Sequence, residues 1–247
     1  MRAWTAKAST SRRSNWPQAL LTRVPVGSVV SWILPNWHEA AVIYRAATMA
    51  GMVDNPILPS LRDRELLFIL DDADTRMIFV PSTFGGHDYA AMLDRVIAQL
   101  ESPPEVVVVR GDTPWPAVSS PVIAMPALDP DAVRMILYRS GTTGRPKGVL
   151  HSHNSIHGLI CQIRDHWQIR PGHRFLVPSP IAHIGGSIYA FECPLLLGTS
   201  AVLMQRWNDD EAVEITRAKQ CTHIAGATPF LKQMRTAARR SGPDCRS

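Results

Sequence analysis

The chain has 247 residues with a net charge of +5, and 45% of them are hydrophobic, which predicts one large domain or two small ones with a genuine core. The positive charge lies at the two ends of the chain. The first 38 residues contain no acidic residue, and residues 232–247 contain one, Asp244. The segment between them is slightly acidic, which excludes the basic surface typical of a nucleic-acid-binding protein.

Both ends of the chain differ in composition from its body. Residues 1–25 form a basic leader, rich in Arg and Ser, that we expect to be disordered. An organellar transit peptide has a similar composition, but this segment lacks the apolar stripe of such a peptide. Residues 233–247 form a basic tail. No apolar run approaches the roughly 20 residues that span a bilayer, so we expect no transmembrane segment.

From residue 29 onward, strand-like runs alternate with helical patterns. Asn36 is expected to cap the first helix and Gly51 to end it, while Asn208 caps a later helix. The proline-rich residues 113–130 predict an irregular connection. This order predicts an α/β fold with parallel sheets flanked by helices on both faces. The predicted strands are 29–34, 75–80, 106–109, 133–138, 175–177, 201–203 and 222–225, and the predicted helices are 37–50, 61–72, 88–100, 153–167, 188–197, 209–219 and 229–240.

Residues 138–149 read YRSGTTGRPKGV and directly follow a predicted strand. Glycines let the backbone turn sharply and approach a ligand closely, while clustered N–H groups, hydroxyls and a lysine suit an anion. The run therefore predicts a phosphate site, and with it a nucleotide site. It is not a Walker A loop, because Gly148 rather than Ser or Thr follows Lys147, and it lacks the Gly-x-Gly-x-x-Gly spacing of a dinucleotide-binding turn.

This run resembles the phosphate loop of the adenylate-forming (AMP-binding) superfamily, which includes acyl-CoA synthetases, luciferases and peptide-synthetase adenylation domains. In that superfamily the loop reads Tyr-(Thr/Ser)-Ser-Gly-(Thr/Ser)-Thr-Gly-x-Pro-Lys-Gly. The resemblance extends over residues 26–232 and is closest to synthetases of medium-chain, alicyclic or aromatic acids. Further segments similar to the family's are residues 34–37, 51–59, 151–153, 178–186 and 226–231.

The resemblance implies two stacked α/β subdomains. Residues 26–232 would supply the first subdomain and part of the second, as a partial AMP-binding domain without the small C-terminal domain. The implied activity is that of an acyl-CoA synthetase-type ligase of fatty acid metabolism. Such an enzyme converts a fatty, alicyclic or aromatic acid with ATP into an acyl-adenylate and then into an acyl-CoA. ATP, Mg²⁺ and coenzyme A are thus the implied cofactors and co-substrates.

The matched positions carry implied roles. Lys147 and His183 are the candidate catalytic residues, with Lys147 on the β- and γ-phosphates of ATP and His183 beside the acyl carboxylate. The residues implied to hold the phosphates are Ser140, Gly141, Thr142, Thr143, Gly144, Lys147 and Gly148. The residues implied to border the acid are His183, Gly185, Gly186, Gly226, Ala227 and Thr228.

Plainer interpretations of some of these features stay open. His183 could be a strand-end histidine bonded to the backbone, and residues 226–229 could form an ordinary turn between a strand and a helix. His151, His153 and His157 include a His-x-His spacing that can chelate a metal. No carboxylate or thiolate set stands near them in the sequence, so we expect no metal site there.

The four cysteines are far apart in the sequence and form no CxxC pair. This spacing predicts reduced thiols rather than a zinc site or a disulfide framework, and it favours a cytoplasmic location. The residues are Cys161, Cys193, Cys221 and Cys245.

The sequence departs from the family pattern in two ways. Arg139 stands where the family has a small hydroxyl residue, and it could either pair with phosphate or crowd the loop. The chain also ends at Ser247, before the family's later motifs for Mg²⁺, for the ribose, for the hinge and for the catalytic lysine. We expect a sheet truncated in this way to leave apolar surface and strand edges uncovered, and hence to self-associate.

Two hypotheses of different class follow. In the first, the chain is a truncated acyl-CoA synthetase-type enzyme, or half of one that a second chain completes. In the second, it is a catalytically inactive remnant with at most phosphate or nucleotide binding. We favour little activity for the isolated chain, because the missing contacts together supply several kcal/mol of transition-state stabilisation. An unrelated phosphate-binding module would need the segments at Pro178 and Gly226 to match the family by chance.

Overall fold

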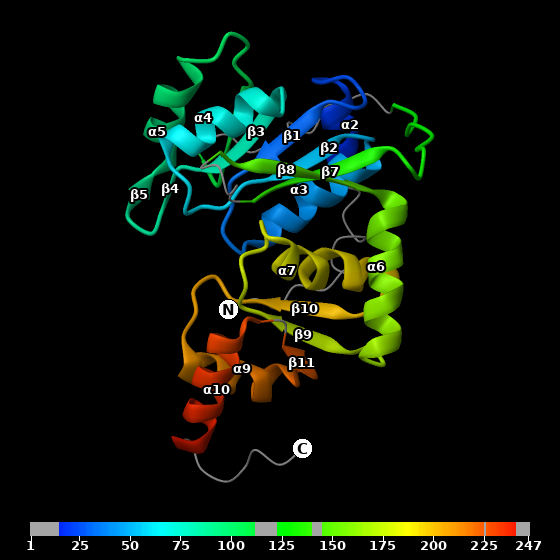
Figure 1. Cartoon of the computed structure of the whole chain (residues 1–247), viewed down its shortest axis with the longest axis vertical. Coiled ribbons are helices and arrows are strands. Elements are labelled where there is room, and N and C mark those ends of the chain that lie inside the picture. The colour runs from blue at the N-terminus through cyan, green and yellow to red at the C-terminus, as the bar shows by residue number, and fades with distance from the viewer. Residues whose placement is uncertain (1–14, 112–122, 140–144, 225, 241–247) are drawn as a thin grey trace. The chain divides into compact units, whose positions relative to one another are not determined.

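The computed structural model describes residues 15–111, 123–139, 145–224 and 226–240 (Figure 1). These residues divide into two compact units, each with its own sheet. We call residues 15–35 and 39–158 the six-stranded unit, and residues 36–38 and 159–240 the three-stranded unit.

The main sheet of the six-stranded unit has the strand order β6-β3-β1-β2-β7-β8. Its first five strands pair in parallel, which requires crossover connections, and helices lie in several of them. β8 pairs antiparallel with β7, so a short turn suffices between these two. The strands are β1 (Val29–Trp32), β2 (Val53–Pro56), β3 (Thr75–Pro81), β6 (Glu105–Val109), β7 (Val133–Arg139) and β8 (Lys147–Ser152).

A hydrophobic core joins this sheet to two helices, α4 (Asp63–Asp72) and α5 (Tyr89–Ile97). Each helix buries apolar residues spaced three and four apart, which place one stripe of the helix against the sheet. The buried set on the helices is Leu66, Ile69, Leu70, Tyr89, Met92, Leu93 and Val96, and it packs on Ile33, Ile57, Ile78 and Val80. The other elements are α2 (Trp16–Leu21), α3 (His38–Met49), and a small hairpin of β4 (Thr83–Phe84) and β5 (His87–Asp88).

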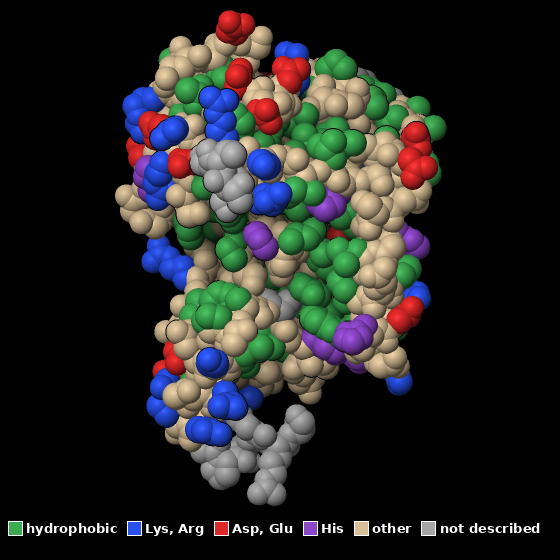
Figure 2. Space-filling view, viewed as in Figure 1, with side chains coloured by type: hydrophobic (Ala, Val, Ile, Leu, Met, Phe, Trp, Pro, Cys, Tyr) green, Lys and Arg blue, Asp and Glu red, His purple; other side chains and the backbone are tan. Residues whose placement is uncertain are grey.

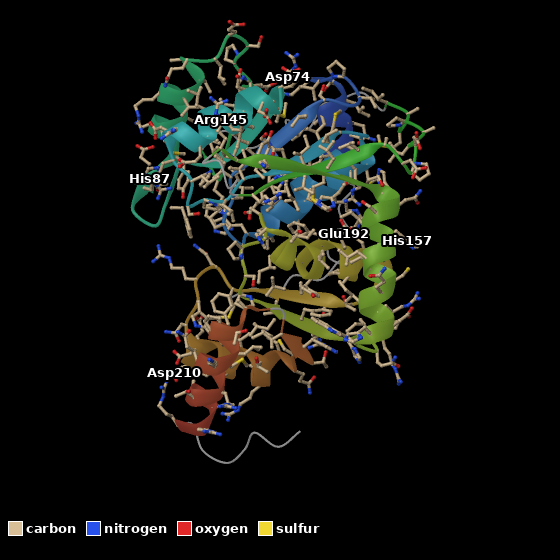
Figure 3. All side chains as sticks on the ribbon, in the orientation of Figure 1. Asp74, His87, Arg145, His157, Glu192 and Asp210 are labelled. Carbon is tan, nitrogen blue, oxygen red and sulfur yellow. The ribbon has the colours of Figure 1, made fainter. Side chains whose placement is uncertain are left out.

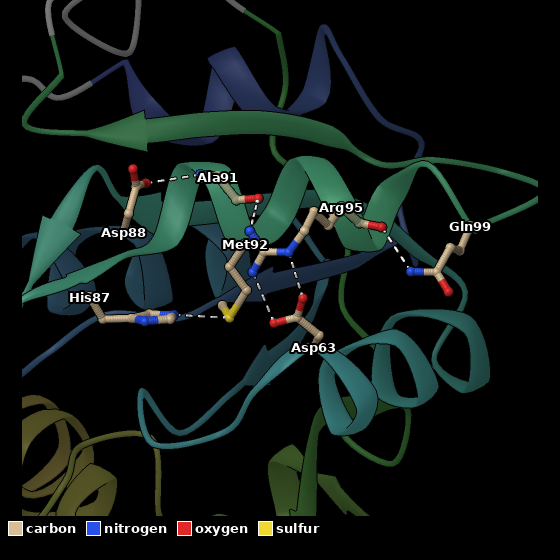
Figure 4. A network of polar contacts seen from close by, with 7 residues as sticks. All are labelled: Asp63, His87, Asp88, Ala91, Met92, Arg95 and Gln99. Atoms are coloured by element: carbon tan, nitrogen blue, oxygen red, sulfur yellow. Dashed lines mark hydrogen bonds and ion pairs between the residues drawn. The ribbon is translucent and has the colours of Figure 1, made fainter.

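Polar contacts also tie α4 to α5 (Figure 4). Arg95 donates from Nε and an Nη to the two carboxylate oxygens of Asp63, at 2.9 and 3.2 Å. This hydrogen bonding, together with the positive charge, lowers the pKa of Asp63. Asp88 caps α5 by accepting from the Ala91 N–H at 2.9 Å. Because these contacts are exposed, we expect them to contribute little to the free energy of unfolding.

The three-stranded unit has the parallel order β10-β9-β11. One face packs α9 and α10 on Leu176, Val202 and Met204, and the other contacts the helical segment 184–197 through Phe175 and Tyr189 (Figure 1). Helix α6 (His153–His166) passes from the six-stranded unit into this one. The elements are β9 (Arg174–Val177), α7 (Ile184–Ser187), η1 (Ile188–Glu192), α8 (Cys193–Leu197), β10 (Ser200–Leu203), α9 (Asp209–Lys219), β11 (His223–Ile224) and α10 (Thr228–Arg240).

The predicted α/β class, with mostly parallel strands between helices, is confirmed. Asn208 caps α9 as predicted, accepting from the Glu211 N–H at 2.9 Å. The predicted cap at Asn36 is wrong, because α3 begins at His38 and the Asn36 side chain bonds to another segment. Strands β2, β4, β5 and β8 were not predicted. The sequence of β8 contains Gly148 and lies at the sheet edge with most of its residues exposed, so it shows no alternation of apolar and polar residues.

The structure differs from expectation at both ends of the described chain. Helix α2 lies inside the expected disordered leader, because Pro17 suits a first helical turn and Ala19 and Leu20 are buried. Helix α10 continues through Arg240 into the expected basic tail. Residues 113–122 of the expected irregular connection lie outside the described residues, and residues 123–129 form no helix or strand.

Candidate functional site

The predicted phosphate loop joins the two strands of the β7–β8 hairpin. Tyr138 pairs with Gly148, and Arg139 pairs with Lys147 on the last rung. The two ends of the loop therefore lie side by side at one end of the hairpin. Ser140, Gly141, Thr142, Thr143 and Gly144, which carry most of the predicted phosphate contacts, lie outside the described residues.

Tyr138 anchors the base of this loop to α4. Its hydroxyl donates to the Asp72 carboxylate at 2.6 Å, at the last residue of α4. Burial, with the hydrogen bond and charge of Asp72, raises the pKa of the Tyr138 phenol. Across the hairpin, a Cβ on residue 148 would lie 3.1 Å from Ile136 Cγ2 and 3.4 Å from the Tyr138 ring. Glycine at 148 thus lets β8 pass close to the anchored ring.

The loop end of the hairpin is rich in cations. Arg139, Arg145 and Lys147 are exposed, and Arg145 is labelled in Figure 3. Within the described part of the chain, none of the three forms an ion pair with a carboxylate. The flanks of the predicted phosphate loop therefore present uncompensated positive charge.

The second group of predicted residues lies in the three-stranded unit, just after β9. The Asn36 amide holds the segment that leads to His183. Its Nδ2 donates to the carbonyls of Val177 and Ser179, at 3.3 and 2.9 Å, and its Oδ1 accepts from the Ile181 N–H at 3.0 Å. Sequence reasoning missed this role. The available signal was an asparagine placed directly after the carboxyl end of a buried strand, where side chains often meet a ligand or another segment.

His183 begins helix α7 and bonds to the backbone. Its Nδ1 accepts from the Gly185 N–H at 3.1 Å, so a neutral ring carries its proton on Nε2. The backbone at Gly186 passes so close to Pro180 that only glycine fits, because a Cβ there would lie 2.2 Å from the Pro180 carbonyl oxygen. The geometry agrees with the plain backbone-bonded interpretation of His183, and it leaves Nε2 as a donor for a further group.

The segment containing Gly226, Ala227 and Thr228 adjoins this block. A Cβ on residue 226 would lie 3.4 Å from the Pro178 ring and 3.1 Å from the Phe230 ring. The Phe230 N–H donates to the Ala227 carbonyl at 3.0 Å in the turn that opens α10. Gly226 thus lies beside Pro178, five residues before His183 in the chain and in the same unit.

Other candidate clusters have structural explanations. Within residues 15–111, 123–139, 145–224 and 226–240, no group of three His, Cys, Asp or Glu side chains is placed to hold a metal ion. Burial and the nearby charge of Arg134 lower the pKa of His151. His157 and Asp210 are labelled in Figure 3, and Asp210 pairs with Arg240 at 2.9 Å. None of the helices described is long and apolar enough to cross a membrane.

The parallel α/β sheet that ends in a glycine-rich hairpin, followed by a second α/β unit, defines the N-terminal domain fold of adenylate-forming enzymes. The AMP-binding enzyme family matches residues 13–246, and the chain belongs to that family. The predicted resemblance is thereby confirmed.

Curated relatives are CoA ligases. The chain is 29% identical over 234 residues to "Medium-chain fatty-acid--CoA ligase" of Escherichia coli (strain K12), covering 88% of this chain and 40% of that protein. It is 27% identical over 234 residues to "3-hydroxybenzoate--CoA/4-hydroxybenzoate--CoA ligase" of Thauera aromatica, covering 91% and 43%. The crystal structure of ATP-bound MatB from Rhodopseudomonas palustris matches with a TM-score of 0.76 and 24% identity, covering 89% and 43%. The chain therefore spans about two fifths of the length of these proteins.

Proposed function

We propose that this chain is the ATP- and acid-binding part of an acyl-CoA synthetase-type ligase. In this reaction the acid carboxylate attacks the α-phosphorus of ATP, pyrophosphate leaves, and an acyl-adenylate forms. The thiol of coenzyme A then attacks the acyl carbonyl, and AMP leaves. The observation that carries the proposal is the β7–β8 hairpin, whose last rung places Arg139 and Lys147 at the two ends of the glycine- and threonine-rich loop.

The chemistry requires positive charge on the departing pyrophosphate. We assign Lys147 to the β- and γ-phosphates, with the hydroxyls of Ser140, Thr142 and Thr143 as further partners. Backbone N–H groups at Gly141, Gly144 and Gly148 would complete the cradle, because glycine lets the chain approach the ligand. Mg²⁺ would add charge to the phosphates, and we assign it no ligand among the described residues.

On the acid side, we assign His183 to the carboxylate through Nε2. Its Nδ1 is already used by the Gly185 N–H, which fixes the ring and its tautomer. Residues at Gly185, Gly186, Gly226, Ala227 and Thr228 would border the acid. The relatives named above act on a medium-chain fatty acid and on hydroxybenzoates, which supports an apolar or aromatic acid as the substrate class. The separated cysteines favour a cytoplasmic location.

The experiment is carboxylate-dependent ATP–pyrophosphate exchange by the purified chain, across fatty, alicyclic and aromatic acids. We expect Lys147→Ala to abolish any exchange, since it removes the phosphate cation. Lys232→Ala on α10 is the matched control and should leave the exchange unchanged. Exchange that survives Lys147→Ala would count against the assignment of this residue.

The second candidate is nucleotide or phosphate binding without catalysis, and the observation that favours it is the pair of exposed cations, Arg139 and Lys147, at the two ends of the predicted phosphate loop. A folded chain that binds ATP but supports no exchange with any acid would establish it. Exchange restored by a second chain that carries the remaining part of a relative would instead indicate a divided enzyme.

A further inference from the structure

The last rung of the β7–β8 hairpin holds two cations opposite each other. Arg139 and Lys147 are direct partners in the antiparallel register. Directly opposed residues have Cβ atoms about 4.5–5.5 Å apart on the same face, and like charges there are destabilising. The rung is thus unfavourable unless something negative lies between or beside the two side chains.

Asp72 lies close to the neighbouring rung, and its carboxylate accepts a hydrogen bond from the Tyr138 hydroxyl. The sequence has no Asp or Glu between Asp131 and Asp165, a stretch that contains Arg134, Arg139, Arg145, Lys147 and Arg164. No carboxylate of the described residues forms an ion pair with Arg139 or Lys147. Figure 2 shows Lys and Arg side chains, with Asp and Glu side chains among them, on the surface of the six-stranded unit.

The register of the rung is fixed by its neighbour. Tyr138 packs against the core of the six-stranded unit and donates to Asp72, and Gly148 opposite leaves room for its ring. Because successive strand residues point to opposite faces, Arg139 and Lys147 lie together on the face away from that core. A slip of one residue would turn Tyr138 out of the core, so the two cations are held in place.

We infer that Arg139 is a second phosphate-binding cation, and that Arg139 and Lys147 together form a site for the terminal phosphates of a di- or triphosphate. The ligand is taken from the proposed function, with ATP and its product pyrophosphate as the species bound. The arginine fork can bind phosphate oxygens in a bidentate way, while lysine supplies a point charge. Arg139 thereby adds a contact at a position where the adenylate-forming pattern has a small hydroxyl residue.

The test measures binding of ATP, tripolyphosphate, pyrophosphate and AMP to the full chain by titration calorimetry. We expect Arg139→Gln to weaken tripolyphosphate and ATP binding about tenfold, as loss of one charge-assisted contact does. AMP binding should stay unchanged, because AMP lacks the terminal phosphates. Arg139→Lys should recover only part of the affinity, because lysine keeps the charge but not the bidentate fork. Arg145→Gln, which removes a neighbouring loop charge outside the rung, is the matched control and should cost less than about twofold.

A second readout separates a ligand contact from a structural role. Without an anion, Arg139→Gln should melt at the same or a higher temperature than the unaltered chain at low salt, because it relieves repulsion on the rung. With tripolyphosphate present, the variant should gain less thermal stability than the unaltered chain. A residue that merely supports the hairpin would give a lower melting temperature in both conditions.

Undiminished tripolyphosphate binding by Arg139→Gln overturns the inference and leaves the proposed ligase function standing. An equal loss in Arg145→Gln also overturns it, because the effect would then be general electrostatics. Loss of affinity specific to Arg139, in a chain that supports no pyrophosphate exchange, supports the two-cation site and counts against the proposed activity. Affinity for tripolyphosphate without affinity for ATP would support the anion site and exclude the nucleotide as its ligand.

Discussion

At the scale of single residues, the side chain of Asn36 forms hydrogen bonds with a segment that is distant in the sequence. All three of its side-chain hydrogen bonds go to residues 177–181, more than 140 positions later in the chain. An amide suits this place because it offers donors to two carbonyls and an acceptor to one N–H. The bonds hold the end of β9 and the turn that leads to His183.

We therefore predict that Asn36→Ala lowers the free energy of unfolding by about 2–3 kcal/mol, as expected for the loss of several half-buried hydrogen bonds. Asn36→Asp should also destabilise, and more at neutral than at acidic pH, because its ionised carboxylate would face the carbonyls of Val177 and Ser179. Urea denaturation at two pH values measures both effects. Asn154→Ala is the control: it removes an exposed bond to Asp131 and should cost only about 0.5 kcal/mol. Equal losses at positions 36 and 154 would contradict the role given to Asn36.

At the scale of elements, the helical segment 184–197 shows how one proline shapes a helix. Pro194 has no N–H, and its ring would clash with the carbonyl four residues earlier in a regular helix. The structure relieves this with a π-helical turn, η1, in which the Cys193 N–H donates to the Ile188 carbonyl five residues back. Gly198 then ends the helix at a φ of +66°.

The start of the same segment yields a prediction about glycine. Gly186→Ala should destabilise the chain by about 3 kcal/mol or more, because the new Cβ would lie 2.2 Å from the Pro180 carbonyl oxygen and the turn at His183 would have to move. Gly158→Ala is the opposite case, since it lies in α6 with nothing within 4 Å of a Cβ. It should stabilise the chain by about 0.5–1 kcal/mol through helix propensity. Thermal unfolding of both variants tests the pair, and a tolerated alanine at 186 would show that the turn can relax.

Most helices and parallel strands could be predicted from sequence because their signals are local. Asn208 and Asp88 cap their helices, four consecutive valines form most of β6, and β1 and β3 are mostly apolar. The misses depend on contacts distant in the chain. Asn36 bonds beyond residue 176, and the antiparallel strand β8 is held by its pairing with β7 rather than by its own composition. Lys147 and Gly148 lie in β8 opposite Arg139 and Tyr138, and the roles given to Lys147 and His183 stay predictions.

At the scale of the whole molecule, β8 stands at the edge of the six-stranded sheet with its outer backbone groups unpaired by any described strand. Leu150 is 61% exposed and Val149 is 38% exposed on this strand. An exposed edge with apolar side chains is a template for pairing with another chain.

We therefore predict that the chain self-associates in a concentration-dependent way. Leu150→Lys should reduce this association, because a charge on an edge strand opposes strand pairing. Sedimentation velocity over a range of concentrations measures the effect. Leu231→Lys changes another exposed apolar residue, which lies on the helix α10 rather than on an edge strand, and should leave the association as it is. If both variants associate like the unaltered chain, the β8 edge is not the surface through which the molecules meet.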